Sequence, residues 1–206
     1  MTSRGPVGSW VCAAVLVGLA GCTVGEGSGE VHSDQLYIQD CWQGPFDLHP
    51  TFFGANPYRQ DTLIIRVQRG DNLEEMSDGL TVLVNSVAAI RQGMLGQPIA
   101  VGMPPGVSPP GVPVTGAPAP LASLSLYLHD TCHRANGAVF STGGTITFHS
   151  LFSGNPNESS AAARLTDAEF DAAFADPRDK DAAHASQVTG NFRFYFQRGQ
   201  PAQPFP

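Results

Sequence analysis

The chain has 206 residues and a formal net charge of −7, with 18 acidic side chains against 11 basic ones. This acidic balance makes nucleic acid and anionic lipid headgroups poor partners for the folded part, because both are themselves negatively charged. Glycine (23) and proline (17) together outnumber the charged side chains, which favours many turns and short strands over long helices.

The N-terminal segment has one basic residue, Arg4, followed by an apolar run from Trp10 to Ala20. A basic start, a short apolar stretch and small residues before a cleavage point are typical of a secretion signal. The apolar run has only about half of the ~20 residues that a membrane-spanning helix needs. We therefore expect residues 1–21 to be removed as a signal peptide.

The segment Leu19-Ala20-Gly21-Cys22 resembles the lipobox of bacterial lipoproteins, in which a peptidase cuts before a cysteine that already carries diacylglycerol. The resemblance covers residues 1–22 and implies that Cys22 becomes the lipidated first residue of a lipoprotein. Two or more acyl chains anchor a protein stably to a membrane. Thr23 rather than aspartate follows the cysteine, which by the same resemblance favours the outer membrane over the inner one. The alternative is an ordinary secreted protein that is cut nearby.

Residues 22–33 are rich in glycine, serine and glutamate, a composition that buries too little apolar surface to order itself. We expect a lipidated flexible tether here and a single domain over residues 34–206. Loss of residues 1–21 removes Arg4 and no acidic residue, so the mature chain has 10 basic and 18 acidic side chains and a formal charge of −8. The expected partners are the membrane, through the lipid, and a protein or glycan, but no nucleic acid.

Two cysteines, Cys41 and Cys132, remain in the expected domain. In an oxidising envelope such a pair predicts one structural disulfide. The alternatives are a pair of free reactive thiols, or a metal site that also uses His49 and His133, but the short ligand spacing typical of zinc sites is missing. We expect no metal and no cofactor.

Alternating apolar and polar residues predict several strands of an antiparallel sheet. A run that is apolar on both faces predicts a central strand, and Gly143-Gly144 predicts the turn of a hairpin. The proline-rich stretch 103–120 predicts an extended crossover, with an exposed polyproline face for a partner as the alternative. The expected strands are 62–68, 80–87, 98–103, 121–129 and 191–197, and the expected hairpin is 138–149.

One short helix is predicted in the C-terminal region. Thr166 and Glu169 have the spacing of a capping box, Phe170 and Phe174 are one helical turn apart, and Pro177 would end the helix. The predicted fold is therefore mainly β, an antiparallel β-sandwich of about seven or eight strands with one short helix.

No sequence motif of a common hydrolase, nucleotide-binding or zinc-protease family is present. The acidic loop 71–79 and three histidines, at positions 129, 133 and 149, are weak candidates for cation binding, and solvated side chains are the simpler interpretation. The preferred hypothesis is a non-catalytic binding, adhesion or envelope-organising module. The alternative is a hydrolase of cell-wall or surface glycan that uses scattered residues such as Asp40, Asp130 or His129.

A group of aromatic residues lies within the stretch 42–58. Packing that seals one end of the core is the simpler interpretation, and a platform for a sugar or peptide is the alternative. The candidate ligand-binding residues are Trp42, Phe46, Phe52, Phe53 and Tyr58.

Overall fold

The computed structural model describes residues 27–71, 74–108, 118–133, 137–180 and 184–197. Cys22 and the expected signal peptide lie outside the described residues. The described chain is mainly β, as predicted, and forms one sheet of ten strands in the order β2-β1-β10-β9-β8-β6-β7-β5-β4-β3. The strands are β1 (Gly27–Ile38), β2 (Trp42–Leu48), β3 (Phe52–Arg59), β4 (Thr62–Gln68), β5 (Asp78–Asn85), β6 (Pro98–Gly102), β7 (Ala122–Leu128), β8 (Ala138–Ser150), β9 (Leu165–Ala175) and β10 (Ser186–Tyr195).

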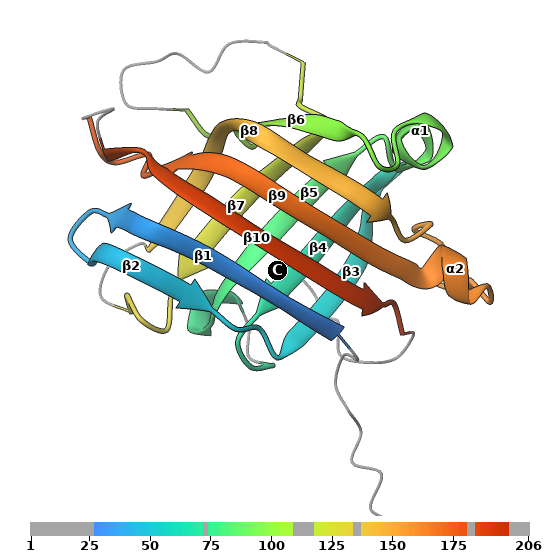
Figure 1. Ribbon diagram of the computed structural model, residues 1–206, viewed down its shortest axis with the longest axis horizontal. Helices are drawn as coiled ribbons and strands as arrows, with labels where there is room; N and C mark the ends of the chain where they lie inside the picture. The colour runs from blue at the N-terminus through green and yellow to red at the C-terminus, as the bar shows by residue number, and fades with distance from the viewer. Residues whose placement is uncertain (1–26, 72–73, 109–117, 134–136, 181–183, 198–206) are drawn as a thin grey trace, which may run out of the picture.

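The sheet curls so that its two halves face each other (Figure 1). Strands β2, β1, β10 and β9 lie in front of β7, β5, β4 and β3 and cross them at an angle. The long strand β8 connects the two halves of the sheet. It pairs with β9 along most of its length, with β7 near its start and with β6 near its end. We refer to the two halves as the front layer and the back layer.

The predicted sandwich of seven or eight antiparallel strands needs correction in strand number and connectivity. The strands number ten in the described residues, and β6 and β7 pair in parallel. Parallel neighbours need a crossover of a dozen or more residues. The proline-rich stretch 103–120 connects this pair, and its residues 109–117 lie outside the described ones.

The core lies between the layers and is built by the alternation that predicted the strands. Strand β4 coincides with the predicted 62–68, and β5, β6, β7 and β10 overlap the other predicted strands. Inward side chains are buried, including Leu63, Ile65 and Val67 from β4, Leu124, Leu126 and Leu128 from β7, and Phe192 and Phe194 from β10. Strand β5 lies between β4 and β7, the central place that its two apolar faces predicted.

The predicted helix after Thr166 is wrong, because Leu165–Ala175 is strand β9. Inward residues alternate along it from Thr166 to Phe174, and both neighbours, β8 and β10, pair with it along its length. The four-residue spacing of Phe170 and Phe174 fits a strand as well as a helix, since four is also a multiple of two. The helices described are α1 (Val87–Gly93), α2 (Ala161–Arg164) and a 3₁₀ turn, η1 (Glu74–Met76).

The predicted hairpin at Gly143-Gly144 is also wrong, since β8 runs through both glycines. A bulge between Ser141 and Gly143 shifts the register against β9. A Cβ atom on Gly144 would lie 2.4 Å from the backbone oxygen of Asp171. Glycine is therefore needed at this position for close approach of the β9 backbone and for its positive φ of 111°, not for a turn.

The predicted tether is partly ordered, because residues 27–33 belong to β1, and residues 27–32 pair with β10. A Cβ atom on Gly27 would lie 2.6 Å from the Phe53 ring and 2.8 Å from Cβ of Phe194. The apolar surface that packs this segment comes from distant strands, so its own composition could not indicate its order. Within the described ranges, no helix has the length and apolar character to cross a membrane.

Candidate functional site

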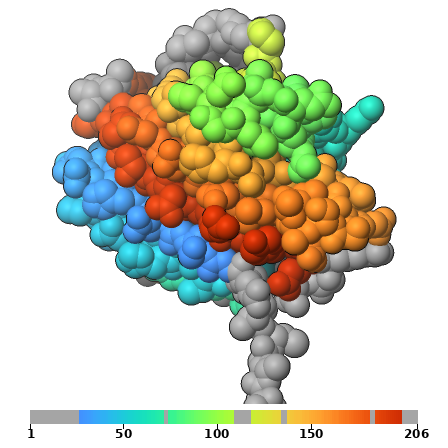
Figure 2. Space-filling view, turned by 45° about the vertical axis from the view of Figure 1, so that its right-hand side comes forward, coloured from blue at the N-terminus to red at the C-terminus, as the bar shows by residue number. Residues whose placement is uncertain are grey.

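The outer face of the front layer carries a hollow of about 340 Å³, which we call the polar hollow. It extends across four adjacent strands, β1, β10, β9 and β8, and Figure 2 shows the N-terminal strands, β10 and β9 as one continuous face. Its lining residues are Glu30, His32, Thr145, Thr147, Glu169, Phe170, Asp171, Thr189, Gly190 and Asn191.

The register of the strands arranges the outward side chains of the polar hollow in two rows. One row is Glu30–Asn191–Glu169–Thr147 and the other is His32–Thr189–Asp171–Thr145, each member paired with the next across neighbouring strands. Neighbouring strands are about 4.8 Å apart and alternate residues about 6.7 Å apart. The sheet backbone therefore holds eight polar groups in a fixed grid.

Carboxylates dominate the charge of the polar hollow, and no Lys or Arg occurs among its described lining residues. Glu30 accepts a hydrogen bond from the Asn191 side chain at 3.0 Å, Asp171 accepts one from Gln187, and Glu169 lies 3.6 Å from the His149 ring. These contacts leave carboxylate oxygens available, because each carboxylate can accept about four hydrogen bonds.

His32 borders the polar hollow between two carboxylates. Its ring nitrogens lie 2.7 Å from Asp47 and 3.1 Å from Asp34. Hydrogen bonding to Asp47 and then to Asp34 raises the pKa of His32 above its ordinary value. Even when the imidazole is protonated, these three side chains together keep a net negative charge.

Gly190 forms the floor of the polar hollow, and we predict that it cannot carry a side chain. A Cβ atom there would lie 2.6 Å from the Glu30 carbonyl oxygen and 2.6 Å from the Phe170 ring, which covers the glycine from the core side. Gly190→Ala should lower the free energy of unfolding by about 1–3 kcal/mol, as overpacking does. Urea denaturation measures the change. Gly143→Ala is the matched control, since nothing lies within 4 Å of the added atom, and equal stability of the two variants would contradict the close packing.

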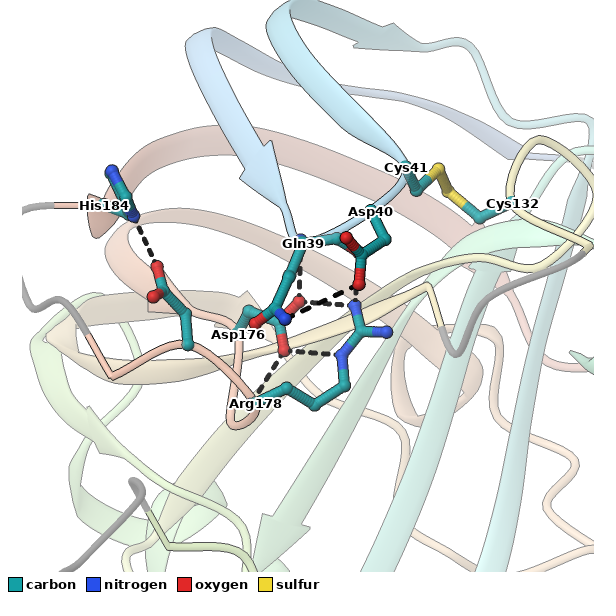
Figure 3. A network of polar contacts seen from close by, with 8 residues as sticks. Gln39, Asp40, Cys41, Cys132, Asp176, Arg178 and His184 are labelled. Carbon is teal, nitrogen blue, oxygen red and sulfur yellow. Dashed lines mark hydrogen bonds and ion pairs between the residues drawn. A yellow bond between two sulfur atoms is a disulfide. The ribbon is translucent and has the colours of Figure 1, made fainter.

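The second polar assembly lies at the end of the front layer, where the turn between β1 and β2 is held from two sides (Figure 3). Cys41 in this turn is disulfide-bonded to Cys132 in the loop after β7, with a Cα–Cα distance of 5.6 Å. This confirms the predicted pairing and joins the front layer to the back layer.

On the side of the turn away from the disulfide, Asp176 and Arg178 form hydrogen bonds with the backbone of Gln39 (Figure 3). The Gln39 N–H donates to Asp176 at 2.9 Å, and Arg178 donates to the Gln39 carbonyl oxygen at 2.9 Å and to Asp176 at 2.6 Å. Burial alone would raise the pKa of Asp176, but the bonds from Arg178 and from the N–H of Gln39 outweigh it and lower the pKa. We call this pair the Asp176–Arg178 clamp. His184 nearby bonds Asp179 and stacks on Tyr37, with ring centroids 4.2 Å apart.

A third polar group lies on the back layer, and its charged side chains pair with other parts of the chain. Arg66 is buried on β4 and pairs with Glu74 of η1 at 3.0 Å. Burial raises the pKa of Glu74. The buried carboxylate of Asp78 accepts hydrogen bonds from the backbone N–H groups of Asp130 and Thr131 and from the Thr131 hydroxyl. These acidic residues of the loop 71–79 therefore bind other parts of the chain.

The structure does not bring the five predicted aromatic residues into one exposed platform. Phe46 and Phe53 are buried in the core, where Phe53 stacks on Phe194, and Trp42 packs against the core edge-on to Phe46. Phe52 is buried on the opposite face of β3 from Phe53. Tyr58 is 54% exposed, with the Arg59 guanidinium 5.0 Å from its ring.

The residues considered for scattered catalysis lie apart from the polar hollow. Asp40 is exposed in the β1–β2 turn, and Asp130 is exposed in the loop after β7. His129 bonds the Glu74 carbonyl oxygen at 2.8 Å and stacks on Tyr127. In the part of the chain that is described, no group of three His, Cys, Asp or Glu side chains has the arrangement of a metal site.

The polar residues of the hollow were not predicted from the sequence, because each is an ordinary outward position of a strand. A signal existed in the alternating acidic and hydroxyl side chains, such as Glu169 and Asp171 on β9 and Thr145 and Thr147 on β8. These side chains can be assigned to one surface only when the register of the four strands is known. Comparison of the chain with protein-family models, with curated proteins and with solved structures finds no match.

Proposed function

We propose that this protein is a lipid-anchored lipoprotein of the bacterial envelope, and that its domain is a non-catalytic binding module which uses the polar hollow. The observation that carries the binding part is the grid of polar side chains on four adjacent strands. A volume of about 340 Å³ is near the lower end for ligand pockets, which suits one or two side chains of a partner better than a whole small molecule.

The described hydrogen bonds support binding through this face. Thr145, Thr147 and Thr189 point outward between the carboxylates, and the described residues give their hydroxyl groups no hydrogen-bond partner. Donors and acceptors held on a rigid sheet without internal partners are pre-organised for an external ligand, which lowers the entropic cost of binding.

Site-specific photo-crosslinking in intact cells tests the binding function. A photoreactive residue at Thr145, an exposed position in the polar hollow, should give a discrete adduct that the same residue at Ser159 does not give. Ser159 is an exposed loop position before α2 and does not line the hollow. Absence of adducts at Thr145, or the same adducts from both positions, would contradict binding at this face.

The lipid anchor is proposed from the lipobox resemblance alone. Electrostatic attraction could not replace it, because the acidic mature chain would be repelled by anionic lipid. We propose the outer membrane as its location. Cys22→Ala should abolish labelling with a radioactive fatty acid and move the protein from the membrane fraction to the soluble fraction. Cys12→Ala, which replaces a cysteine inside the expected signal peptide, is the matched control and should keep both the label and the membrane association. Persistent labelling of Cys22→Ala would contradict a lipid anchor on Cys22.

A further inference from the structure

We infer that the polar hollow binds an extended segment of a partner protein in which basic side chains alternate with other residues. This inference rests on the proposed binding function and names the chemistry of the ligand. It is drawn from the charges, the spacing and the side-chain types of the lining residues.

Charge complementarity indicates a cationic ligand. Glu30, Glu169 and Asp171 line the polar hollow, and His32 at its border is held by Asp34 and Asp47. The nearest described arginine on this face of β10, Arg193, is paired with Asp167 at 2.7 Å. A basic ligand would meet three carboxylates, whereas an anion would meet the same carboxylates with no described Lys or Arg in the lining to compensate them.

The spacing of the carboxylates indicates an extended ligand. Glu169 and Asp171 project from the same face of β9, two residues and about 6.7 Å apart along the strand. In an extended peptide, side chains at positions i and i+2 lie on one face with the same separation. Two basic side chains in this relation can each reach one carboxylate, while the three threonine hydroxyls can accept from the remaining N–H groups.

The side-chain types favour a protein segment over a glycan. Recognition of an uncharged sugar typically uses an exposed aromatic face. The described aromatic residue of the lining, Phe170, is 5% exposed and lies beneath Gly190 on the core side. The accessible contacts are hydroxyl and carboxylate groups, the Asn191 amide and the His32 ring, and the carboxylates suit charge-assisted hydrogen bonds from arginine or lysine.

Fluorescence anisotropy with the full-length mature protein in detergent micelles tests the inference. The probe is a labelled peptide, Gly-Ser-Arg-Thr-Arg-Ser-Gly, and two comparison peptides carry citrulline in place of both arginines or place the arginines next to each other. We expect Glu169→Gln/Asp171→Asn to weaken binding of the probe about tenfold, and added salt to weaken it further. Glu75→Gln/Asp130→Asn removes two exposed carboxylates outside the polar hollow and should change the affinity by less than about twofold.

The outcomes separate this inference from the proposed function. Equal binding of the citrulline peptide, equal binding of the adjacent-arginine peptide, or equal loss in both double variants would overturn the alternating basic segment. A partner cross-linked at Thr145 through a segment without basic residues would overturn it as well and leave the binding function standing. If no partner is cross-linked there, the proposed function itself fails.

Discussion

Replacing both Cys41 and Cys132 with serine is expected to lower the free energy of unfolding by about 4–5 kcal/mol. The disulfide closes a loop with a sequence separation of 91, and cross-linking of so long a loop removes much conformational entropy from the unfolded chain. The Asp176–Arg178 clamp still holds the β1–β2 turn in the variant, so the loss should come mainly from the unfolded state and from detachment of the loop after β7.

Urea denaturation of the double variant, in a chain that also carries Cys22→Ala, measures this effect. A reducing agent should lower the midpoint of the parent chain to that of the variant and should leave the variant unchanged. An unchanged midpoint after loss of both cysteines would contradict a stabilising disulfide. Formation of the bond can be checked by mass mapping of non-reduced peptides, in which Cys41 and Cys132 should be linked.

Loss of the Asp176 carboxylate is expected to have the next largest effect. Its side chain is fully buried, whereas that of Arg178 is 30% exposed. Asp176→Ala would leave the Gln39 N–H without its acceptor and Arg178 without its ion-pair partner, which should lower the free energy of unfolding by about 3 kcal/mol. Asp167→Ala is the matched control, because it breaks an ion pair with Arg193 of similar length but at 23% and 56% exposure. That exposed pair should contribute at most about 1 kcal/mol.

The same carboxylate predicts a pH dependence. The pKa of Asp176 is lower in the folded protein than its ordinary value of about 3.9 in an unfolded chain. Its contribution to stability is therefore complete above the unfolded pKa and is lost as the pH falls through the folded pKa. The stability difference between the parent chain and Asp176→Asn should shrink below about pH 4. A constant difference between pH 7 and pH 3 would contradict the proposed role of the charge.

The mainly β fold could be predicted because the alternation of apolar and polar residues can be recognised within each strand segment by itself. In β4, the residues Leu63, Ile65 and Val67 face the core, and this pattern predicts a strand without any information from the neighbouring strands. The disulfide could be predicted because residues 23–206 contain a single pair of cysteines, and such a pair predicts one disulfide if the domain is secreted.

The errors arose where local patterns fit two structures. The capping-box spacing of Thr166 and Glu169 is a local helix signal, but pairing with β8 and β10 on both sides favours the extended strand β9. Gly143-Gly144 fits a hairpin turn, yet the glycines serve close packing against β9. The polar hollow depends on the register of four strands from distant parts of the sequence, and this information is not local.

We propose that a lipid on Cys22 holds the folded acidic domain on a membrane. The most direct test is mass spectrometry of the N-terminal peptide of the mature protein, isolated from the membrane fraction of cells that produce it. The account predicts a chain that begins at Cys22 and carries the mass of a diacylglyceryl group on the thiol. A mature chain that begins at another residue, or an unmodified Cys22, would contradict it.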